Sequence, residues 1–254
     1  MITKQELKLY SLLKQKKYRD IEKKFFVEGL RVLREAVKSD YICEYILMTE
    51  DCYNKKNDEL AGYISQKTAW AIISQKEFES LSDTKTPQGI GGVFKMKENK
   101  NIISPDKILY FDTISDPGNA GTLIRSAGWF GFSQVVFSAD SVESYSPKMI
   151  RSTAGVYFLC DILRDEEDYS LLKKLKSESY LILGADMKGQ DYRSIDILEN
   201  KIVLVVGNEA AGLSYSAENL IDKKISIQGS GIAESLNVAV AGSILMSRLA
   251  DRLR

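Results

Sequence analysis

Three short segments in the second half of the chain combine polar side chains with glycines, as ligand-binding loops commonly do. They are residues 116–125 with Asn119 and Arg125, residues 207–214 with Glu209, and residues 227–238 with Ser235 and Asn237. The last two segments follow apolar runs of strand type, and a further such run ends just before the first. In open parallel sheets, ligands bind in the loops at the carboxyl ends of strands. We therefore expect the three segments to form one ligand site.

The composition removes several kinds of chemistry from consideration. The 254 residues include no histidine, which excludes Ser-His-Asp and Cys-His nucleophiles and any metal site that needs imidazole. The three cysteines show no CxxC spacing, so we expect no metal and no disulfide framework. A phosphate-binding P-loop motif is absent from the sequence. Glu234 stands where a third glycine would complete a dinucleotide fingerprint after Gly229 and Gly231, which disfavours a nicotinamide or flavin site.

Together, the three segments resemble the SpoU (TrmH-type) family of RNA ribose 2′-O-methyltransferases. They follow the order of the family's motifs, which makes the signal specific although each motif alone would be weak. The matching residues are Asn119, Gly121, Arg125, Gly207, Glu209, Gly212, Gly231, Ser235, Leu236, Asn237 and Val238. The chain departs from the family at Gln228 and Gly229, where the family often has Pro-Met after the equivalent of Ile227.

This resemblance implies a fold, a cofactor and an assembly. The implied fold is a SPOUT-type α/β domain, a trefoil-knotted and mostly parallel sheet with helices on both faces. The implied cofactor is S-adenosylmethionine, bound by the main chain at Gly207, Ile227 and Leu236, and the implied assembly is a homodimer. In the first half, residues 26–36 and 86–90 resemble the family's small substrate-binding domain, an α/β RNA-binding fold similar to certain ribosomal proteins.

The implied reaction is the attack of a ribose hydroxyl on a methyl group with a neutral leaving group. An enzyme for this reaction mainly positions the reactants and stabilises a developing oxyanion. Because a guanidinium resists deprotonation, our hypothesis is that Arg125 grips the target phosphate and stabilises the alkoxide. The proton then leaves to phosphate or water. The structural alternative for Arg125 is a helix arginine in a surface ion pair.

Each of the other polar residues has a structural and a functional interpretation. Asn119 either caps the helix that carries Arg125 or orients Arg125 or the ribose. Glu209 either pairs with Arg125 and fixes its side-chain conformation or is a simple loop carboxylate. Ser235 and Asn237 open the final helix, where one caps it and the other holds the ribose or the methionine end of the cofactor. Together with Arg125, these four residues are the candidate catalytic residues.

Basic side chains are concentrated at one end of a chain whose total net charge is zero. Residues 1–38 hold eleven Lys or Arg and five Asp or Glu, a local net charge of +6. This pattern fits either a solvated helix face or a surface that meets phosphates. The candidate RNA contacts are Lys16, Lys23, Lys24, Arg31 and Arg34. Tyr18, Phe25 and Phe26 could stack on unpaired bases, although the interpretation as core residues is stronger.

Hydrophobic patterning predicts the elements that must position these loops. In the first half the predicted helices are 7–13, 25–38 and 77–82, and the predicted strands are 45–48, 70–73 and 89–94. In the second half the predicted strands are 107–111, 134–138, 180–184, 202–207 and 224–227, and the predicted helices are 120–130, 170–176 and 236–253. Short apolar strands that alternate with helices indicate a parallel sheet covered on both faces. We expect an RNA-binding domain at 1–95, a linker at 96–106 and a methyltransferase domain at 107–254.

The sequence thus predicts an S-adenosylmethionine-dependent RNA 2′-O-methyltransferase, and the two-domain layout favours ribosomal RNA as its substrate. The alternatives are a tRNA 2′-O-methyltransferase, a non-catalytic RNA-binding protein that retains the fold, and a small-molecule methyltransferase. No run approaches the ~20 apolar residues of a membrane helix, and the charged N-terminus lacks the apolar core of a signal peptide. Because the cysteines show no disulfide framework, a reducing compartment fits best. We therefore expect a cytoplasmic protein that contacts no membrane.

Overall fold

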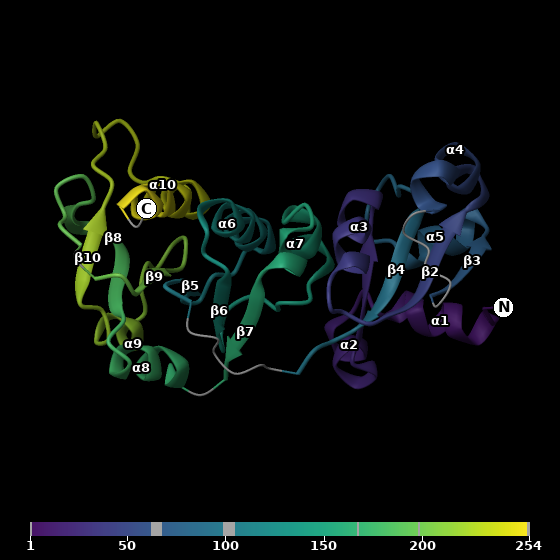
Figure 1. Cartoon of the computed structure of the whole chain (residues 1–254), viewed down its shortest axis with the longest axis horizontal. Coiled ribbons are helices and arrows are strands. Elements are labelled where there is room, and N and C mark those ends of the chain that lie inside the picture. The colour runs from purple at the N-terminus through teal and green to yellow at the C-terminus, as the bar shows by residue number, and fades with distance from the viewer. Residues whose placement is uncertain (1, 62–67, 99–104, 167, 198, 253–254) are drawn as a thin grey trace. The chain divides into compact units, whose positions relative to one another are not determined.

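The computed structural model describes residues 2–61, 68–98, 105–166, 168–197 and 199–252. The chain forms two compact units, coloured along the chain in Figure 1. The first unit comprises Met1–Glu98 and Tyr145–Leu159, and the second comprises Asn99–Ser144 and Cys160–Arg254. The segment 145–159 therefore packs with the first unit, although the sequence places it within the predicted methyltransferase domain.

The first unit is built on a four-stranded sheet with the order β1-β4-β2-β3. Its strands are β1 (Lys24–Glu28), β2 (Cys43–Thr49), β3 (Ala69–Ile73) and β4 (Ile90–Lys95). Strand β4 is antiparallel to both β1 and β2, whereas β3 is parallel to β2. The helices are α1 (Lys4–Leu12), α2 (Lys16–Glu22), α3 (Leu30–Lys38), α4 (Glu50–Ala61), α5 (Gln75–Leu81), α7 (Pro147–Ser152) and the short 3-10 helix η1 (Val156–Leu159).

A strand and a helix occupy residues 24–38, where most of the segment was predicted to be one helix. Residues 25–28 lie in β1 and are all buried, because a strand between two layers buries side chains on both faces. Gly29 then turns the chain with a φ of +97°, a conformation that favours glycine, and α3 begins at Leu30. The helix prediction is therefore wrong for residues 25–28 and correct from Leu30 onward.

Aromatic residues of the segment 145–159 complete the core of the first unit. The ring centroid of Tyr145 lies 4.8 Å from that of Phe25, and the ring of Phe158 lies 5.2 Å from that of Tyr41. Tyr157 is fully buried. Because these rings supply much of the apolar contact around Phe25, residues more than 100 positions further along the sequence are part of this unit's core.

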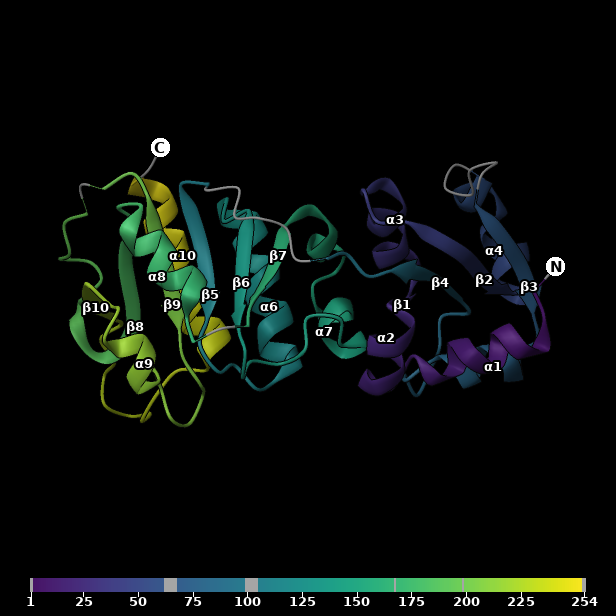
Figure 2. The same ribbon diagram turned by 90° about the horizontal axis from the view of Figure 1, so that it is seen from below.

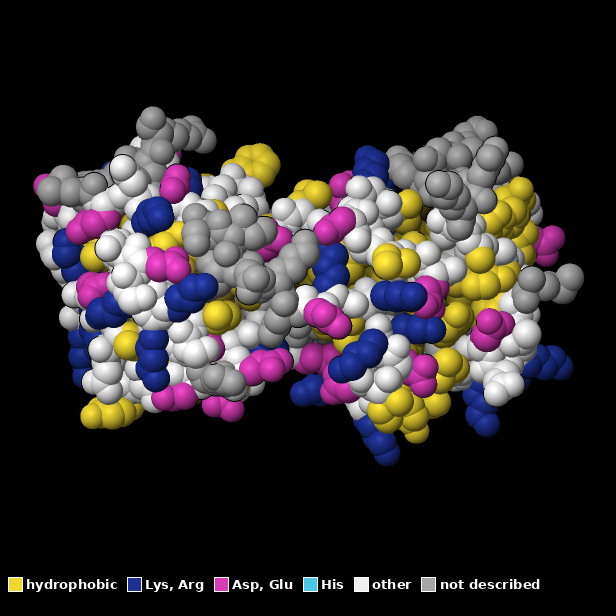
Figure 3. Space-filling model, turned by 60° about the horizontal axis from the view of Figure 1, so that its bottom comes forward, with side chains coloured by type: hydrophobic (Ala, Val, Ile, Leu, Met, Phe, Trp, Pro, Cys, Tyr) yellow, Lys and Arg dark blue, Asp and Glu magenta, His cyan; other side chains and the backbone are white. Residues whose placement is uncertain are grey.

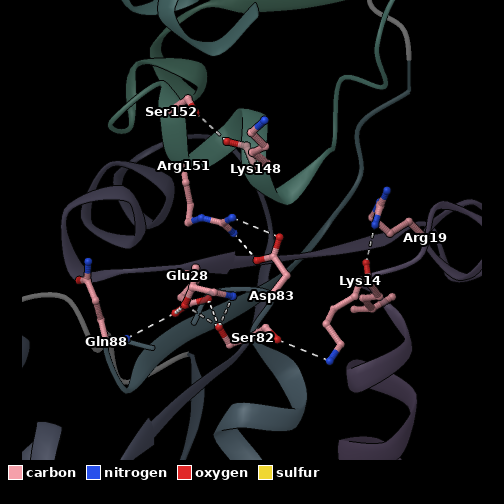
Figure 4. A network of polar contacts seen from close by, with 11 residues as sticks. Lys14, Arg19, Glu28, Ser82, Asp83, Gln88, Lys148, Arg151 and Ser152 are labelled. Carbon is pink, nitrogen blue, oxygen red and sulfur yellow. Dashed lines mark hydrogen bonds and ion pairs between the residues drawn. The ribbon is translucent and has the colours of Figure 1, made fainter. Parts of the chain in front are cut away.

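A polar network next to α7 adds to this packing, as Figure 4 shows. Arg151 of α7 directs both terminal guanidinium nitrogens to the carboxylate of Asp83, with Nη2 3.1 Å from Oδ2. One position before Asp83, Ser82 donates its hydroxyl to Glu28 at 2.5 Å, and Thr84 donates to the other oxygen of Glu28 at 3.0 Å. The buried carboxylate at the end of β1 therefore has the hydrogen-bond partners that its burial requires.

The second unit is built on a six-stranded sheet with the order β10-β8-β9-β5-β6-β7. Its strands are β5 (Lys107–Phe111), β6 (Gln134–Ser138), β7 (Asp161–Asp165), β8 (Leu181–Asp191), β9 (Ile202–Val206) and β10 (Lys223–Ser226). All five pairings between these neighbours are parallel. The helices are α6 (Pro117–Phe130), α8 (Ser170–Ser177), α9 (Tyr215–Glu218) and α10 (Val238–Arg252). Among the described helices, none is long and apolar enough to cross a membrane.

Helices cover both faces of this sheet. In Figure 2, α8 and α9 lie in front of the strands, and α6 and α10 lie behind them. Helices α6 and α10 pack closely where Gly242 has no side chain. A Cβ atom at this position would lie only 2.4 Å from Cδ2 of Leu123. The hydroxyls of Ser126 and Ser243 are 2.7 Å apart across the same contact. The prediction of a mostly parallel sheet with helices on both faces is confirmed.

Candidate active site

The carboxyl ends of β5, β9 and β10 lead directly into the three loops that the sequence singles out. Strand β5 ends at Phe111, β9 at Val206 and β10 at Ser226. Because β5 and β9 are parallel neighbours, the loops that follow them leave from the same edge of the sheet. The third loop leads into α10, which packs against both α6 and β9.

Side-chain hydrogen bonds join the three loops through Asn119. The amide nitrogen of Asn119 donates to Oε1 of Glu209 at 2.8 Å. Its amide oxygen accepts a hydrogen bond from Nδ2 of Asn237 at 3.0 Å. Ser115 donates its hydroxyl to the second oxygen of Glu209 at 3.3 Å. Hydrogen bonds thus join residues that are as many as 118 positions apart in the sequence.

Asp116, and not Asn119, caps the helix that carries Arg125. The side chain of Asp116 accepts a hydrogen bond from the backbone N–H of Asn119 at 2.8 Å, and Pro117 occupies the first helical position. The helix therefore begins three residues earlier than predicted, and the capping interpretation of Asn119 is wrong. Its side chain is left to bond the two other loops.

The guanidinium of Arg125 is exposed on α6, six residues after Asn119. Within the described part of the chain it has no hydrogen bond or ion pair, so the proposed pair with Glu209 does not form. Glu209 bonds to Asn119 and Ser115 instead. A guanidinium without a protein partner is available to bind an anionic substrate.

Asn237 caps the final helix, and Ser235 lies in the loop before it. The side-chain oxygen of Asn237 accepts from the backbone N–H groups of Ala239 at 2.9 Å and Val240 at 3.3 Å. Its amide nitrogen is the group that reaches Asn119. Ser235 is exposed. Asn237 thus both caps α10 and bonds to Asn119. Two residues away, the hydroxyl of Ser235 faces solvent.

The loop after β9 is folded tightly on itself, and Gly207 permits this. A Cβ atom at Gly207 would lie 2.4 Å from the carbonyl carbon of Gly212, closer than any side chain can approach. Asn208 and Gly212 exchange two backbone hydrogen bonds, at 2.8 Å and 2.9 Å. Gly207 is therefore required by the loop's own geometry, and its main chain lies at the carboxyl end of the sheet.

The loop 227–237 presents main-chain polar groups that a ligand could use. Ile227 is half-buried directly after β10, and Leu236 has an exposed fraction of 48%. Between them, residues 228–236 make no hydrogen bonds to other backbone groups of the described chain. S-adenosylmethionine needs backbone donors and acceptors beside an apolar slot for its adenine. Gly207, Ile227 and Leu236 fit that need.

Two residues that bind these loops were missed by the sequence reasoning. Asp112 is fully buried directly after β5 and accepts hydrogen bonds from two other segments. Asn208 donates its side-chain amide to the carbonyl of Thr113 at 2.9 Å. An aspartate that follows an apolar strand was a visible signal for the first, whereas the partners of both lie far away in the sequence. Across the described residues, no group of three or more Cys, Asp or Glu could hold a metal ion.

The candidate RNA contacts of the first unit differ in how free they are. Lys16, Lys23 and Arg31 are exposed, and Arg34 is half-buried. Lys24 forms an ion pair with Glu44 at 2.7 Å. On the face shown in Figure 3, Lys and Arg are interspersed with Asp and Glu, so the positive charge is not one continuous patch. Phe25 and Phe26 are buried, which confirms their interpretation as core residues.

Comparisons with known families match both halves of the chain. A model of the SpoU rRNA Methylase family matches residues 106–247. A model of the MRM3-like substrate binding domain matches residues 4–92. These matches contain the three loops and the basic N-terminal segment.

Individual proteins match the chain over nearly its whole length. It is 32% identical over 245 residues to the 23S rRNA (guanosine(2553)-2′-O)-methyltransferase RlmP of Bacillus subtilis, covering 96% of each chain. A putative RNA methyltransferase of the TrmH family from Porphyromonas gingivalis has a TM-score of 0.88 at 26% identity, covering 99% of both chains. An AdoMet-bound rRNA methyltransferase from Sinorhizobium meliloti has a TM-score of 0.86 at 25% identity, covering 100% of this chain and 97% of that one. With its motif residues gathered at one edge of the sheet, the chain belongs to the SpoU rRNA methylase family.

Proposed function

We propose that this protein transfers a methyl group from S-adenosylmethionine to a ribose 2′-hydroxyl of ribosomal RNA. The observation that carries the proposal is the hydrogen-bonded cluster of Glu209, Asn119 and Asn237, in which Asn119 lies on the same helix as Arg125. The relatives named above as rRNA methyltransferases support the choice of ribosomal RNA.

The cofactor supplies an electrophilic methyl group when bound. The chain's task is to hold that group in line with a ribose oxygen, which is mainly a matter of positioning. In our proposal the main chain at Gly207, Ile227 and Leu236 binds the donor. Asn119 fixes the position of Glu209 and Asn237 around it, and Ser235 adds a hydroxyl that can bind the ribose or the donor's methionine end.

Arg125 acts on the acceptor. A guanidinium resists deprotonation, so Arg125 does not serve as a base. It grips the phosphate next to the target ribose and stabilises the negative charge that develops on the 2′-oxygen. The proton of the hydroxyl leaves to phosphate or water.

The first unit holds the RNA in our proposal. Lys16, Lys23 and Arg31 contact phosphates, since their charges are exposed. Arg34 and Lys24 contribute less, because Arg34 is half-buried and Lys24 already pairs with Glu44. A structured RNA is bound by such scattered cations through its backbone shape more than through its base sequence.

We further propose a homodimer that uses α6 and α10. Trp129 on α6 has an exposed fraction of 84%, and Val240 on α10 and Leu236 in the loop before it are each 48% exposed. Exposed large apolar side chains on two packed helices suit a protein interface. Light scattering should give the mass of a dimer, and Trp129→Glu should shift it toward the monomer. A monomeric wild type would contradict the dimer.

The trefoil knot of the family and a cytoplasmic location also belong to this proposal. Strand β9 lies between β8 and β5, and α10 packs against α6 and β9, an arrangement that a threaded C-terminal segment would produce. The similarity to the Bacillus subtilis enzyme supports the cytoplasm, because a bacterial cell assembles ribosomal RNA into subunits there.

One experiment tests the function. The protein is incubated with tritiated S-adenosylmethionine and ribosomal RNA, transfer RNA or no RNA, and label in each RNA is counted. We expect the wild-type protein to label ribosomal RNA, with the label recovered in alkali-resistant dinucleotides. The Arg125→Ala variant should leave the same RNA unlabelled. Label in transfer RNA alone would favour a tRNA enzyme, and label in neither would favour a non-catalytic RNA-binding protein.

A further inference from the structure

Asp112 holds an unusual place at the head of the site. It follows β5 directly, is fully buried, and lies among groups that donate to it. Its Oδ1 accepts from the phenol of Tyr169 at 2.5 Å, and its Oδ2 accepts from the backbone N–H of Ser214 at 2.6 Å. Its own N–H donates to the carbonyl of Val206 at 2.9 Å.

These bonds close a loop at its base. Residues 207–213, here called the donor loop, begin directly after Val206 and end directly before Ser214. Asp112 is bonded to both of these flanking residues, one through its main chain and one through its side chain. A single residue outside the loop therefore fixes the separation of its two ends, and with it the position of Gly207 and Glu209.

Tyr169 supports the same point from a third segment. Its hydroxyl bonds both to Asp112 and to Ser214 Oγ, the latter at 2.7 Å, and Ser214 in turn caps α9. Burial raises the pKa of Tyr169 well above its usual value, so the phenol remains a hydrogen-bond donor. Its ring stacks on Tyr110 of β5 with centroids 6.0 Å apart.

The backbone at this tyrosine is held in an unfavourable conformation. Tyr169 has a φ of +59° and Asp168 a φ of +28°, and neither residue is a glycine. Left-handed conformations of this kind are unfavourable for residues with a Cβ atom and persist where the surrounding structure imposes them. This conformation at the tyrosine that bonds to Asp112 indicates a role beyond the stability of the sheet.

We propose that Asp112 and Tyr169 are positioning residues that hold the donor loop in the conformation that binds S-adenosylmethionine. This deepens the proposed function and rests on its assignment of the donor to this loop. Neither residue touches the donor. They act by fixing the loop's base, so that the main chain of Gly207 and the carboxylate of Glu209 are in place before the donor arrives.

The test uses the full-length protein and a matched pair of tyrosine variants. Tyr169→Phe removes the hydroxyl that bonds to Asp112. Tyr110→Phe removes a buried hydroxyl that bonds to Asp165 at 3.0 Å and not to the donor loop. Asp112→Asn is the third variant. For each protein, calorimetry gives the dissociation constant of S-adenosylmethionine, hydrogen exchange gives the protection of residues 207–214, and thermal unfolding gives the stability.

Tyr169→Phe and Asp112→Asn should raise the dissociation constant by about tenfold or more, the effect expected when a hydrogen bond to a charged group is lost. Both should also speed hydrogen exchange at the Ser214 amide. Tyr110→Phe should lower the melting temperature to a similar extent without either effect. Equal weakening of donor binding in the two tyrosine variants would overturn the proposal, and so would unchanged exchange at residues 207–214. A wild-type protein that binds no donor would overturn the proposed function instead. The exchange measurement would still show whether Asp112 and Tyr169 hold the donor loop.

Discussion

Asn119 donates its side-chain amide to Glu209 across 2.8 Å, and this contact joins the first turn of α6 to the loop after β9. The two residues are 90 positions apart in the sequence. The same amide group accepts a hydrogen bond from Asn237, so one side chain connects all three loops. The predictions below begin from this cluster.

Asn119 and Glu209 should behave as one unit in catalysis. Asn119→Ala and Glu209→Gln should each lower kcat by about tenfold, and the double variant should be little worse than the poorer single one, because both remove the same contact. Single-turnover rates for the four proteins measure this. The control is Ser126→Ala, which removes the hydrogen bond to Ser243 between α6 and α10 and leaves the cluster intact. Losses that multiply in the double variant would show that the two residues act separately.

Arg125 should matter to the reaction and not to donor binding. Arg125→Ala should lower kcat by about 10²–10³-fold, the usual effect of removing a group that stabilises a developing oxyanion. The dissociation constant of S-adenosylmethionine should stay within about twofold of the wild type, since the side chain forms no hydrogen bond or ion pair with the donor-binding residues in the described chain. Arg125→Lys, which keeps the charge without the fork geometry, should recover only part of the rate. Near-normal turnover by Arg125→Ala would remove this residue from the mechanism.

The exposed cations of the first unit should contribute to RNA affinity one by one. Lys16→Ala and Arg31→Ala should each weaken RNA binding and reduce the slope of log K against log salt by about one. Lys24→Ala should change the slope less, because its ammonium already pairs with Glu44. Filter binding at several salt concentrations gives the slopes. Equal slopes for all three variants would show that the ion pair does not withhold Lys24 from the RNA.

The segment 145–159 should be required for the stability of the first unit. Phe158→Ala removes a buried ring from the aromatic cluster and should lower the free energy of unfolding by about 3–5 kcal/mol. Urea denaturation followed by circular dichroism measures the change. Leu159→Ala, at a side chain that is 64% exposed, is a neighbouring control with little expected effect. A similar loss in both variants would place the contribution in the backbone of η1.

Stability should fall in alkaline solution through two partly buried thiols. Burial raises the pKa of Cys160 to about 11 and that of Cys43 to about 12, from an ordinary value of 9.0. Between pH 9 and these values the unfolded chain releases protons that the folded chain retains, so the stabilisation present below pH 9 is lost as the pH rises. Melting temperatures from pH 7.5 to 10.5 should fall less steeply for a Cys43→Ala, Cys160→Ala double variant than for the wild type. Parallel curves would show that other groups, such as the tyrosines, dominate the decline.

The strands around the site could be predicted because their residues are almost all apolar. Residues 107–111 and 134–138 were predicted with the observed bounds, since short, fully buried runs leave little ambiguity. Strand β7 was missed because only two of its five residues are fully buried. For the site, motif residues were identified from the sequence, but their partners were not. The bonds from Asp112 to Tyr169 and Ser214 span 57 and 102 positions, and local patterning carries no information at such distances.

The residue that caps α6 could not be predicted from the sequence, for a different reason. Asp116 followed by proline is a recognisable helix start, yet Asn119 is also a favourable capping residue, and sequence alone does not rank the two. The structure places Asp116 at the cap and so gives the Asn119 side chain to the loop cluster. Likewise, nothing in residues 145–159 indicates that their rings pack with residues near position 25, because covalent order and spatial neighbourhood differ there.

The insertion of residues 145–159 into the first unit has a consequence for biosynthesis. The ribosome finishes Met1–Glu98 before it makes the rings of Tyr145 and Phe158, which that unit needs to cover Phe25. At about 5–20 residues per second, the nascent chain waits for several seconds with an open apolar surface. During that interval the growing polypeptide is a natural client for chaperones, and codons that slow translation between 99 and 159 should increase its aggregation.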